Sequence, residues 1–166
     1  MIATLAGLAG CGPTPEPQGT FRQTTVPIYS NATFDFGRLP GQWQQAAAFA
    51  VPGAGACPAG RADIAPDLAV TLHLCLNGTV VQARGRIAPA GPGRFRITGA
   101  DAAGIGQDWW VVWVDVGYRT LAIGTPSGAF GFVLNRDGPL PGDRFDAASE
   151  IFDFNGYDRS KLIRLR

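Results

Sequence analysis

The residues with the most specific chemistry form the string Leu8-Ala9-Gly10-Cys11, which ends a short apolar N-terminus. Small side chains before Cys11 would let a peptidase approach the bond that precedes it, and the new N-terminal cysteine would then carry lipid. A transmembrane helix needs about 20 apolar residues, so residues 1–10 are too short to be one. The pattern predicts a signal-peptide remnant over residues 1–10 and lipidation of Cys11; the alternative is a disordered N-terminus with a chance cysteine.

A proline-rich stretch follows this cysteine. Pro13, Pro15 and Pro17 alternate with other residues, which favours extended polyproline II structure. We therefore expect residues 11–33 to be a lipidated tether and residues 34–166 to be one folded domain. Gly12 occupies the position at which an aspartate would favour retention in the inner membrane. We therefore expect an outer-membrane location that faces the periplasm.

The two other cysteines, Cys57 and Cys75, lie at equal distances in sequence from Pro66, where a turn is expected. Antiparallel pairing about that turn would place them opposite each other, and an oxidising periplasm would allow a disulfide. A loop of this length predicts a stabilisation of about 3 kcal/mol. Two free core thiols are the alternative.

Candidate catalytic and metal-binding groups are few. His73 is the only histidine, it shares a strand face with Thr71 and Cys75, and the sequence contains no Cys-x-x-Cys spacing. We expect no metal site, no cofactor and no catalytic residue. Charged residues make up 16% of the chain and the net charge is +1, so a nucleic-acid partner is not expected either.

The elements that position these residues are short apolar runs separated by many of the 23 glycines and 13 prolines, which is typical of an all-β fold. Asn77-Gly78 is a strong hairpin signal. Eight strands joined mainly by tight turns predict an up-and-down antiparallel β-barrel. A helix at residues 142–154, with Asn155-Gly156 after it, is expected to pack outside the barrel. The expected strands are residues 42–51, 60–64, 68–76, 79–87, 94–98, 108–114, 118–123 and 129–135.

Four motifs in order carry a family resemblance. Residues 34–43 contain Gly41-Gln42-Trp43 after Phe34-Asp35, and residues 113–126 contain Asp115-Val116-Gly117-Tyr118 before an apolar strand. Residues 130–136 end in Arg136, and residues 156–162 follow the expected helix. Together they resemble the lipocalins, in particular bacterial outer-membrane lipoprotein lipocalins related to apolipoprotein D. Residues 53–106 carry none of these motifs, so the resemblance implies no ligand identity.

The resemblance gives the motif residues structural roles. Trp43 would plug the closed end of the barrel, and the guanidinium of Arg136 would lie across its indole in a cation–π contact worth about 0.5–2 kcal/mol. Gly41 would let the backbone approach closely there. Asp115 and Tyr118 belong to the turn that is typical of the family. These five residues are expected to hold the fold rather than to bind a ligand.

An eight-stranded barrel can hold one small ligand when its inward side chains leave room. The alternation of apolar residues predicts a lumen with gaps at small residues; in the alternative, the aromatic side chains simply fill the barrel. The strand at 108–114 is apolar on both faces, so which face points inward stays open. The predicted ligand-lining residues are Ala47, Phe49, Val81, Ala83, Phe95, Ile97, Trp110 and Phe132.

These features favour a membrane-anchored lipocalin that binds a fatty acid or a lysophospholipid-like molecule and is not an enzyme. Two alternatives remain open. One is a periplasmic metalloprotease inhibitor on a similar barrel, with residues 12–29 as the arm that enters the enzyme. The other is a barrel enzyme that acts on a hydrophobic substrate, with His73 as its base.

Overall fold

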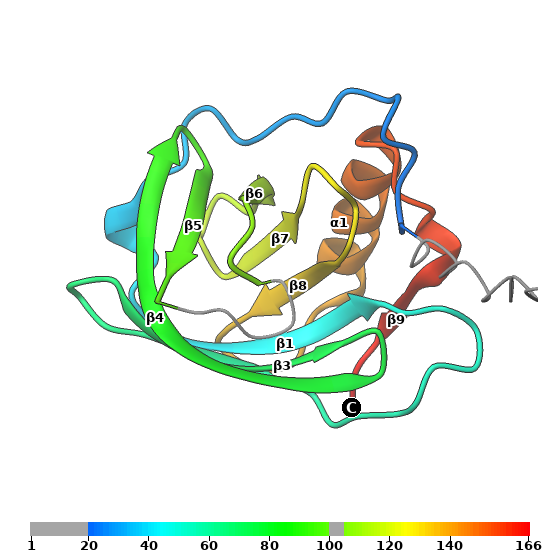
Figure 1. The fold of residues 1–166 in the computed structure, drawn as a ribbon, viewed down its shortest axis with the longest axis horizontal. Coiled ribbons are helices and arrows are strands. Elements are labelled where there is room, and N and C mark those ends of the chain that lie inside the picture. Colours follow the sequence, from blue (N-terminus) through cyan, green and yellow to red (C-terminus); the bar gives the residue numbers. More distant parts are fainter. Residues whose placement is uncertain (1–19, 100–104) are drawn as a thin grey trace, which may run out of the picture.

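The computed structural model describes residues 20–99 and 105–166, so the predictions for residues 1–10 and for Cys11 lie outside the described residues. Within those ranges, nine antiparallel strands form one sheet in the order β2-β3-β4-β5-β6-β7-β8-β1-β9, and β1 also pairs with β2, which closes a barrel. Figure 1 shows helix α1 outside that barrel. The elements are η1 (Phe36–Arg38), β1 (Gly41–Phe49), β2 (Arg61–Ile64), β3 (Ala69–Leu76), β4 (Thr79–Gly91), β5 (Arg94–Thr98), β6 (Trp109–Val114), β7 (Thr120–Gly124), β8 (Gly131–Asn135), α1 (Gly142–Phe154), η3 (Arg159–Lys161) and β9 (Leu162–Arg164).

The predicted fold class is confirmed: eight strands close a barrel, and one helix follows them. Asn77 and Gly78 both have positive φ angles, of 50° and 74°, as a tight hairpin turn requires. Helix α1 has the predicted bounds and ends at Phe154; Asn155 is its C-cap, and Gly156 then takes a left-handed conformation with φ 82°. Strand β4 runs four residues past its predicted end, and β9, which pairs with β1, was not predicted.

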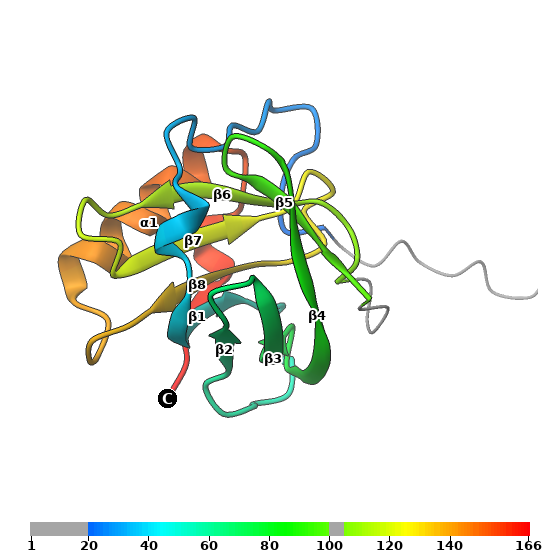
Figure 2. The same ribbon diagram turned by 90° about the vertical axis from the view of Figure 1, so that its left-hand side faces the viewer.

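Two apolar clusters stabilise the molecule. The first fills the barrel and includes Trp43, Trp109 and Phe132, all of them almost fully buried. The second lies between the outer face of the barrel and α1, and it includes Phe49 and Phe152, whose ring centroids are 4.9 Å apart. Figure 2 shows β6, β7 and β8 side by side with α1 behind them. These strands are therefore apolar on both faces.

Two irregularities in the ladders decide which residues join which cluster. The register of β1 against β8 shifts between Gln45 and Ala47, and that of β6 against β7 shifts between Val111 and Trp113. A bulge of one residue reverses the faces of all later residues in a strand. Trp43 therefore faces the barrel interior, whereas Ala47 and Phe49 face outward.

The chain packs against the barrel well before Phe34, the residue at which the folded domain was expected to begin. Phe21 and Arg22 are 2% and 6% exposed. The main-chain N–H of Phe21 donates to the Gly128 carbonyl at 2.8 Å, and Arg22 forms an isolated bridge with Tyr157. Residues 20–33 thus belong structurally to the domain rather than to the expected tether.

Arg22 is buried, and carbonyl oxygens hold its guanidinium. Its Nε donates to the Asn155 carbonyl at 3.1 Å, and its terminal nitrogens donate to the carbonyls of Pro126 and Val26. Asn155 caps the C-terminal end of α1, where the helix dipole is negative and favours a cation. This side chain fastens the N-terminal segment, the β7–β8 connection and α1 to one another.

Candidate functional site

The barrel interior contains an apolar cavity with a volume of about 10 Å³. That volume is close to the space one water molecule occupies, so the barrel's own side chains fill most of the lumen. Every residue that lines the cavity is apolar. They are Leu39, Ala62, Ile64, Val70, Leu72, Leu74, Ile87, Phe95, Ile97, Trp109, Ile123, Phe132 and Leu134.

Five of the predicted ligand-lining residues lie on the inner side of the barrel. Phe95, Ile97 and Phe132 line the cavity itself. Val81 belongs to the inner cluster, and Ala83 packs against it while staying partly buried. That these side chains contact a ligand stays a prediction.

The other three predicted lining residues lie on the outer side. Ala47 and Phe49 belong to the cluster under α1, and Trp110 packs against that cluster. The guanidinium of Arg94 lies 4.1 Å from the centre of the Trp110 ring, on the same outer face. The bulge after Gln45 explains the placement of Ala47 and Phe49. For β6 the inward face proves to be that of Trp109 and Val111, which places Trp110 outside.

Trp43 and Arg136 meet at the end of the barrel that holds η1 and the β6–β7 turn, called the η1 end below. The guanidinium of Arg136 lies 4.1 Å from the centre of the Trp43 ring, so the predicted cation–π contact is present. The indole N–H of Trp43 donates to the Leu39 carbonyl at 2.9 Å. Gly41 has φ 129°, and a Cβ there would lie 3.2 Å from an Arg136 nitrogen. Glycine thus suits this site, because it tolerates the positive φ and leaves room for the Arg136 side chain.

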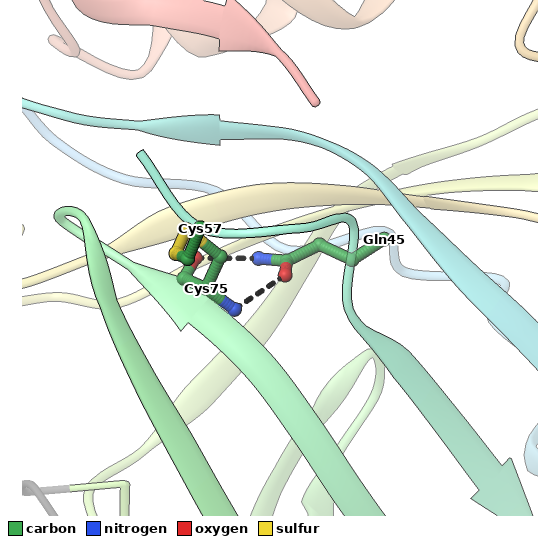
Figure 3. Close-up of a disulfide and its surroundings, with 3 residues drawn as sticks. All are labelled: Gln45, Cys57 and Cys75. Carbon is green, nitrogen blue, oxygen red and sulfur yellow. Dashed lines mark hydrogen bonds between the residues drawn. A yellow bond between two sulfur atoms is a disulfide. The ribbon is translucent and has the colours of Figure 1, made fainter. Parts of the chain in front are cut away.

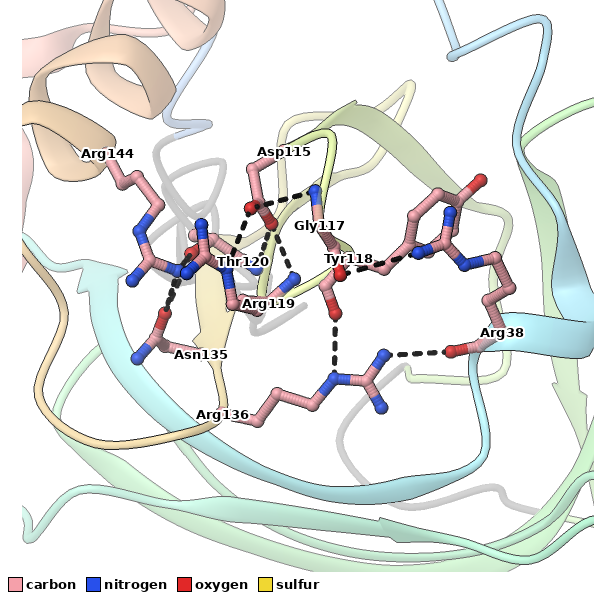
Figure 4. Close-up of polar contacts among 9 residues, drawn as sticks. All are labelled: Arg38, Asp115, Gly117, Tyr118, Arg119, Thr120, Asn135, Arg136 and Arg144. Carbon is pink, nitrogen blue, oxygen red and sulfur yellow. Dashed lines mark hydrogen bonds and ion pairs between the residues drawn. The ribbon is translucent and has the colours of Figure 1, made fainter.

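The β6–β7 turn is organised by the carboxylate of Asp115, which is shown in Figure 4. It accepts hydrogen bonds from the main-chain N–H groups of Gly117, Arg119 and Thr120, the last at 2.6 Å. Burial raises the pKa of Asp115, but these three bonds outweigh burial, so the pKa lies below its usual value. Tyr118, with φ 54°, accepts a hydrogen bond on its hydroxyl from the Asp35 N–H at 2.8 Å.

The side chains of Thr120, Asn135 and Arg144 attach α1 to the barrel near the η1 end. The hydroxyl of Thr120 donates to Asn135 Oδ1 at 2.7 Å, and the guanidinium of Arg144 donates to both residues, to the Thr120 hydroxyl at 2.7 Å. Thr120 and Asn135 are at most 1% exposed. Their polar atoms satisfy one another, which points to a role in docking the helix rather than in binding a ligand.

The disulfide between Cys57 and Cys75 is confirmed, with a Cα–Cα distance of 5.8 Å. Its predicted geometry is wrong, because the β2–β3 register pairs Arg61 with His73. Cys57 therefore precedes β2 and lies in the β1–β2 connection, while Cys75 is paired with Val80 of β4. The bond joins that connection to the end of β3 (Figure 3).

Gln45 supports the disulfide, a role that was not predicted from the sequence. Its side chain is fully buried, donates from Nε2 to the Cys75 carbonyl at 2.9 Å and accepts from the Cys75 N–H at 2.7 Å. Gly60 lies against it, since a Cβ there would approach Gln45 Oε1 to 2.5 Å. The sequence signal that could have indicated this role is a polar amide side chain on an otherwise apolar strand face.

The described residues hold no cluster of three or more His, Cys, Asp or Glu side chains that could bind a metal ion. His73 is half-buried on β3, and its register neighbours are Arg61 on β2 and Gln82 on β4. Neither neighbour is a carboxylate that could orient the imidazole for general-base chemistry. Among the described helices, none has the length and apolar character needed to cross a membrane.

Comparison with known proteins identifies the family. A family model described as a lipocalin-like domain matches residues 77–166, which is more than half of the chain. The chain is a lipocalin. No curated protein matches this lipocalin in sequence.

Solved structures show the same fold at low sequence identity. Insecticyanin from the tobacco hornworm Manduca sexta is 17% identical, with a TM-score of 0.59 and coverage of 89% of both chains. Lobster apocrustacyanin A1 is 13% identical, with a TM-score of 0.54 and coverage of 84% of this lipocalin and 89% of that chain. H1 crustacyanin from the lobster Homarus americanus is 12% identical, with a TM-score of 0.52 and coverage of 82% and 88%.

Proposed function

We propose that this lipocalin is anchored to the outer membrane through Cys11, faces the periplasm and binds the apolar part of a fatty acid or lysophospholipid inside its barrel. The observation that carries the ligand proposal is the composition of the lumen, whose lining residues are all apolar. Burial of hydrocarbon there is favourable by roughly 25 cal/mol per Å². No catalytic step and no cofactor are part of the proposal.

The lumen also restricts the chemistry of the ligand. A charged head group would find no hydrogen-bond partner among the lining residues, and burying it unpaired would be costly. Among the described residues, no buried side-chain nitrogen or oxygen lacks a partner, so none is left over for a ligand. The head group would therefore stay at the mouth, at the end of the barrel opposite Trp43.

A cavity of about 10 Å³ requires side chains to move before an acyl chain can enter. Leu72 is a candidate for this movement, because it lies in register between Ala62 on β2 and Ala83 on β4. Two small neighbours leave it room for a second rotamer. Leu72 would thus act as the side chain that opens the lumen.

The inhibitor alternative is weakened by the packing of its arm. It requires residues 12–29 to enter an enzyme, yet Phe21 and Arg22 are buried against the barrel. The enzyme alternative gains no support from the surroundings of His73.

Titration of the delipidated protein with oleate and with lysophosphatidylcholine, followed by tryptophan fluorescence, tests ligand binding. We expect saturable binding that Leu72→Trp abolishes by filling the lumen, and that Val133→Met, a change on the outer face of β8, leaves in place. Absence of binding to every lipid tried would refute the ligand proposal. Mass spectrometry of the N-terminal peptide from envelope-purified protein tests acylation of Cys11, with Cys11→Ser as the control.

A further inference from the structure

Two exposed aromatic side chains form a patch at the C-terminal end of α1. Tyr29 is 55% exposed and Phe154, the last residue of the helix, is 66% exposed, and their ring centroids are 5.9 Å apart. Ile28 and Ile151 are half-buried beside them and pack against the outer cluster. Other exposed large apolar residues include Val116, in the β6–β7 turn. Tyr29 and Phe154, called the aromatic patch below, have no role in the fold or the lumen that would require such exposure.

Hydrogen bonds fix the main chain beside the patch. The main-chain N–H of Tyr29 donates to the side chain of Asn155 at 2.6 Å, and Asn155 is 1% exposed. The buried guanidinium of Arg22 donates to the carbonyl of the same asparagine. Because this main chain is already fixed, it loses little conformational entropy when a partner covers the rings.

The patch lies near the point at which the chain enters the domain. The main-chain N–H of Gln23 donates to the Gly156 carbonyl, and that of Asp158 donates to the Phe21 carbonyl, both at 2.8 Å. The residues directly after Phe154 thus contact the first described residues. Eight residues, 12–19, separate them from Cys11 and can span at most about 30 Å. An acylated Cys11 would therefore hold this side of the domain close to the bilayer.

The small size of the patch favours a lipid surface over a protein partner. Two side chains cover far less than the roughly 1,200 Å² of a stable protein interface. A tethered contact needs little affinity, because a short linker gives an effective concentration in the millimolar range. Charges of both signs flank the patch: Asp153 precedes Phe154, and Arg94 donates to the Ser30 hydroxyl at 3.0 Å. Aromatic residues are enriched at the membrane interface.

We propose that Tyr29 and Phe154 insert into the head-group region of the membrane and set the orientation of the barrel on it. The inference rests on the proposed anchoring at Cys11 for the source of the membrane, but the contact itself is a property of the folded domain. The η1 end holds the turn before β7, which includes Val116. Phe21, near the point of attachment, contacts the connection after β7, at the opposite end of that strand. The η1 end would therefore point away from the point of attachment.

Vesicle sedimentation tests the patch without the lipid anchor. The full chain carrying Cys11→Ser is mixed with excess vesicles of equal parts phosphatidylethanolamine and phosphatidylcholine. We expect binding that Tyr29→Ser with Phe154→Ser weakens at least about fivefold, whereas Val116→Ser, at an even more exposed apolar site, leaves it unchanged. Equal binding of the parent and the double variant, or no binding by the parent, would overturn the proposal. So would a dimer in solution that the double variant abolishes.

Oleate titration of the same proteins separates this proposal from the ligand proposal. Neither aromatic residue lines the cavity, so the double variant should bind oleate as the parent does. Loss of oleate binding in every protein, together with patch-dependent vesicle binding, would contradict the ligand proposal and support the patch. An unmodified Cys11 in the native envelope would contradict the anchor, and patch-dependent vesicle binding would still support the contact.

Discussion

Arg136 joins three segments of the chain around Trp43. Its guanidinium lies 4.1 Å from the centre of the indole and donates to the carbonyls of Tyr118, Pro40 and Arg38 at 2.7, 3.2 and 3.0 Å. The contact therefore ties the last barrel strand to the β6–β7 turn and to the segment that precedes β1.

Replacement of Arg136 by alanine should lower the free energy of unfolding by about 2–4 kcal/mol, because charge-assisted hydrogen bonds and the cation–π contact are lost together. Arg136→Lys should recover part of that loss, since an ammonium keeps the charge but not the planar fork. Urea unfolding followed by circular dichroism measures both changes. A loss of under about 0.5 kcal/mol in the alanine variant would show that the contact does not stabilise the fold.

Asp115 should make the free energy of unfolding depend on pH in the acidic range. Its pKa is lowered in the folded state, so its contribution is present above the unfolded pKa, about 3.9, and is lost as the pH falls through the folded value. Asp115→Asn should therefore be less stable than the parent at pH 7, and the difference should shrink below about pH 4. Asp137→Asn, at an exposed position after β8, is the matched control. A difference independent of pH would contradict the assignment.

Removal of the disulfide by Cys57→Ser with Cys75→Ser should cost about 3 kcal/mol of unfolding free energy, since the closed loop spans 18 positions.

Gln45→Ala should cost about 2–5 kcal/mol of unfolding free energy in the oxidised protein, because the buried N–H and carbonyl of Cys75 would both lose their partner. Thermal unfolding with and without reductant separates the two contributions. Insensitivity of the Gln45 variant would mean that water replaces the amide.

Enlarging the lumen should create room for a ligand. Ile97→Ala removes a side chain that lines the cavity and should cost about 2–5 kcal/mol of stability. The same variant should bind benzene or a short-chain fatty acid more tightly than the parent. Val133→Ala is the matched control, because Val133 is equally buried but belongs to the cluster under α1. Calorimetric titration compares them, and equal affinities would contradict a lumen site.

Arg22 should govern the attachment of the N-terminal segment. Arg22→Met keeps much of the apolar volume but loses the bonds to the carbonyls of Asn155, Pro126 and Val26. We expect faster hydrogen exchange at the amides of Phe21 and Gln23, while amides in β7 stay protected. Unchanged exchange at Phe21 would show that backbone pairing alone holds the segment.

The barrel strands could be predicted because their alternation, their turns and the Asn77-Gly78 hairpin are local signals. The cation–π contact between Trp43 and Arg136 followed from the family resemblance. The misplacement of Ala47 and Phe49 has a physical cause: nothing in Gln45-Ala46-Ala47 marks a bulge, and one extra residue reverses the face. Strand β9 is only three residues long, and its pairing with β1 is a tertiary effect without a local signal.

The bulge after Gln45 has a consequence for how the molecule folds and unfolds. Through it, Trp43 and Ala48 join the inner cluster, and Ala47 and Phe49 join the outer one, so a single strand contributes to both. Withdrawal of β1 would open the barrel and, at the same moment, remove the contact between Phe49 and Phe152 of the helix. We therefore expect the barrel and its helix to unfold together as one cooperative unit.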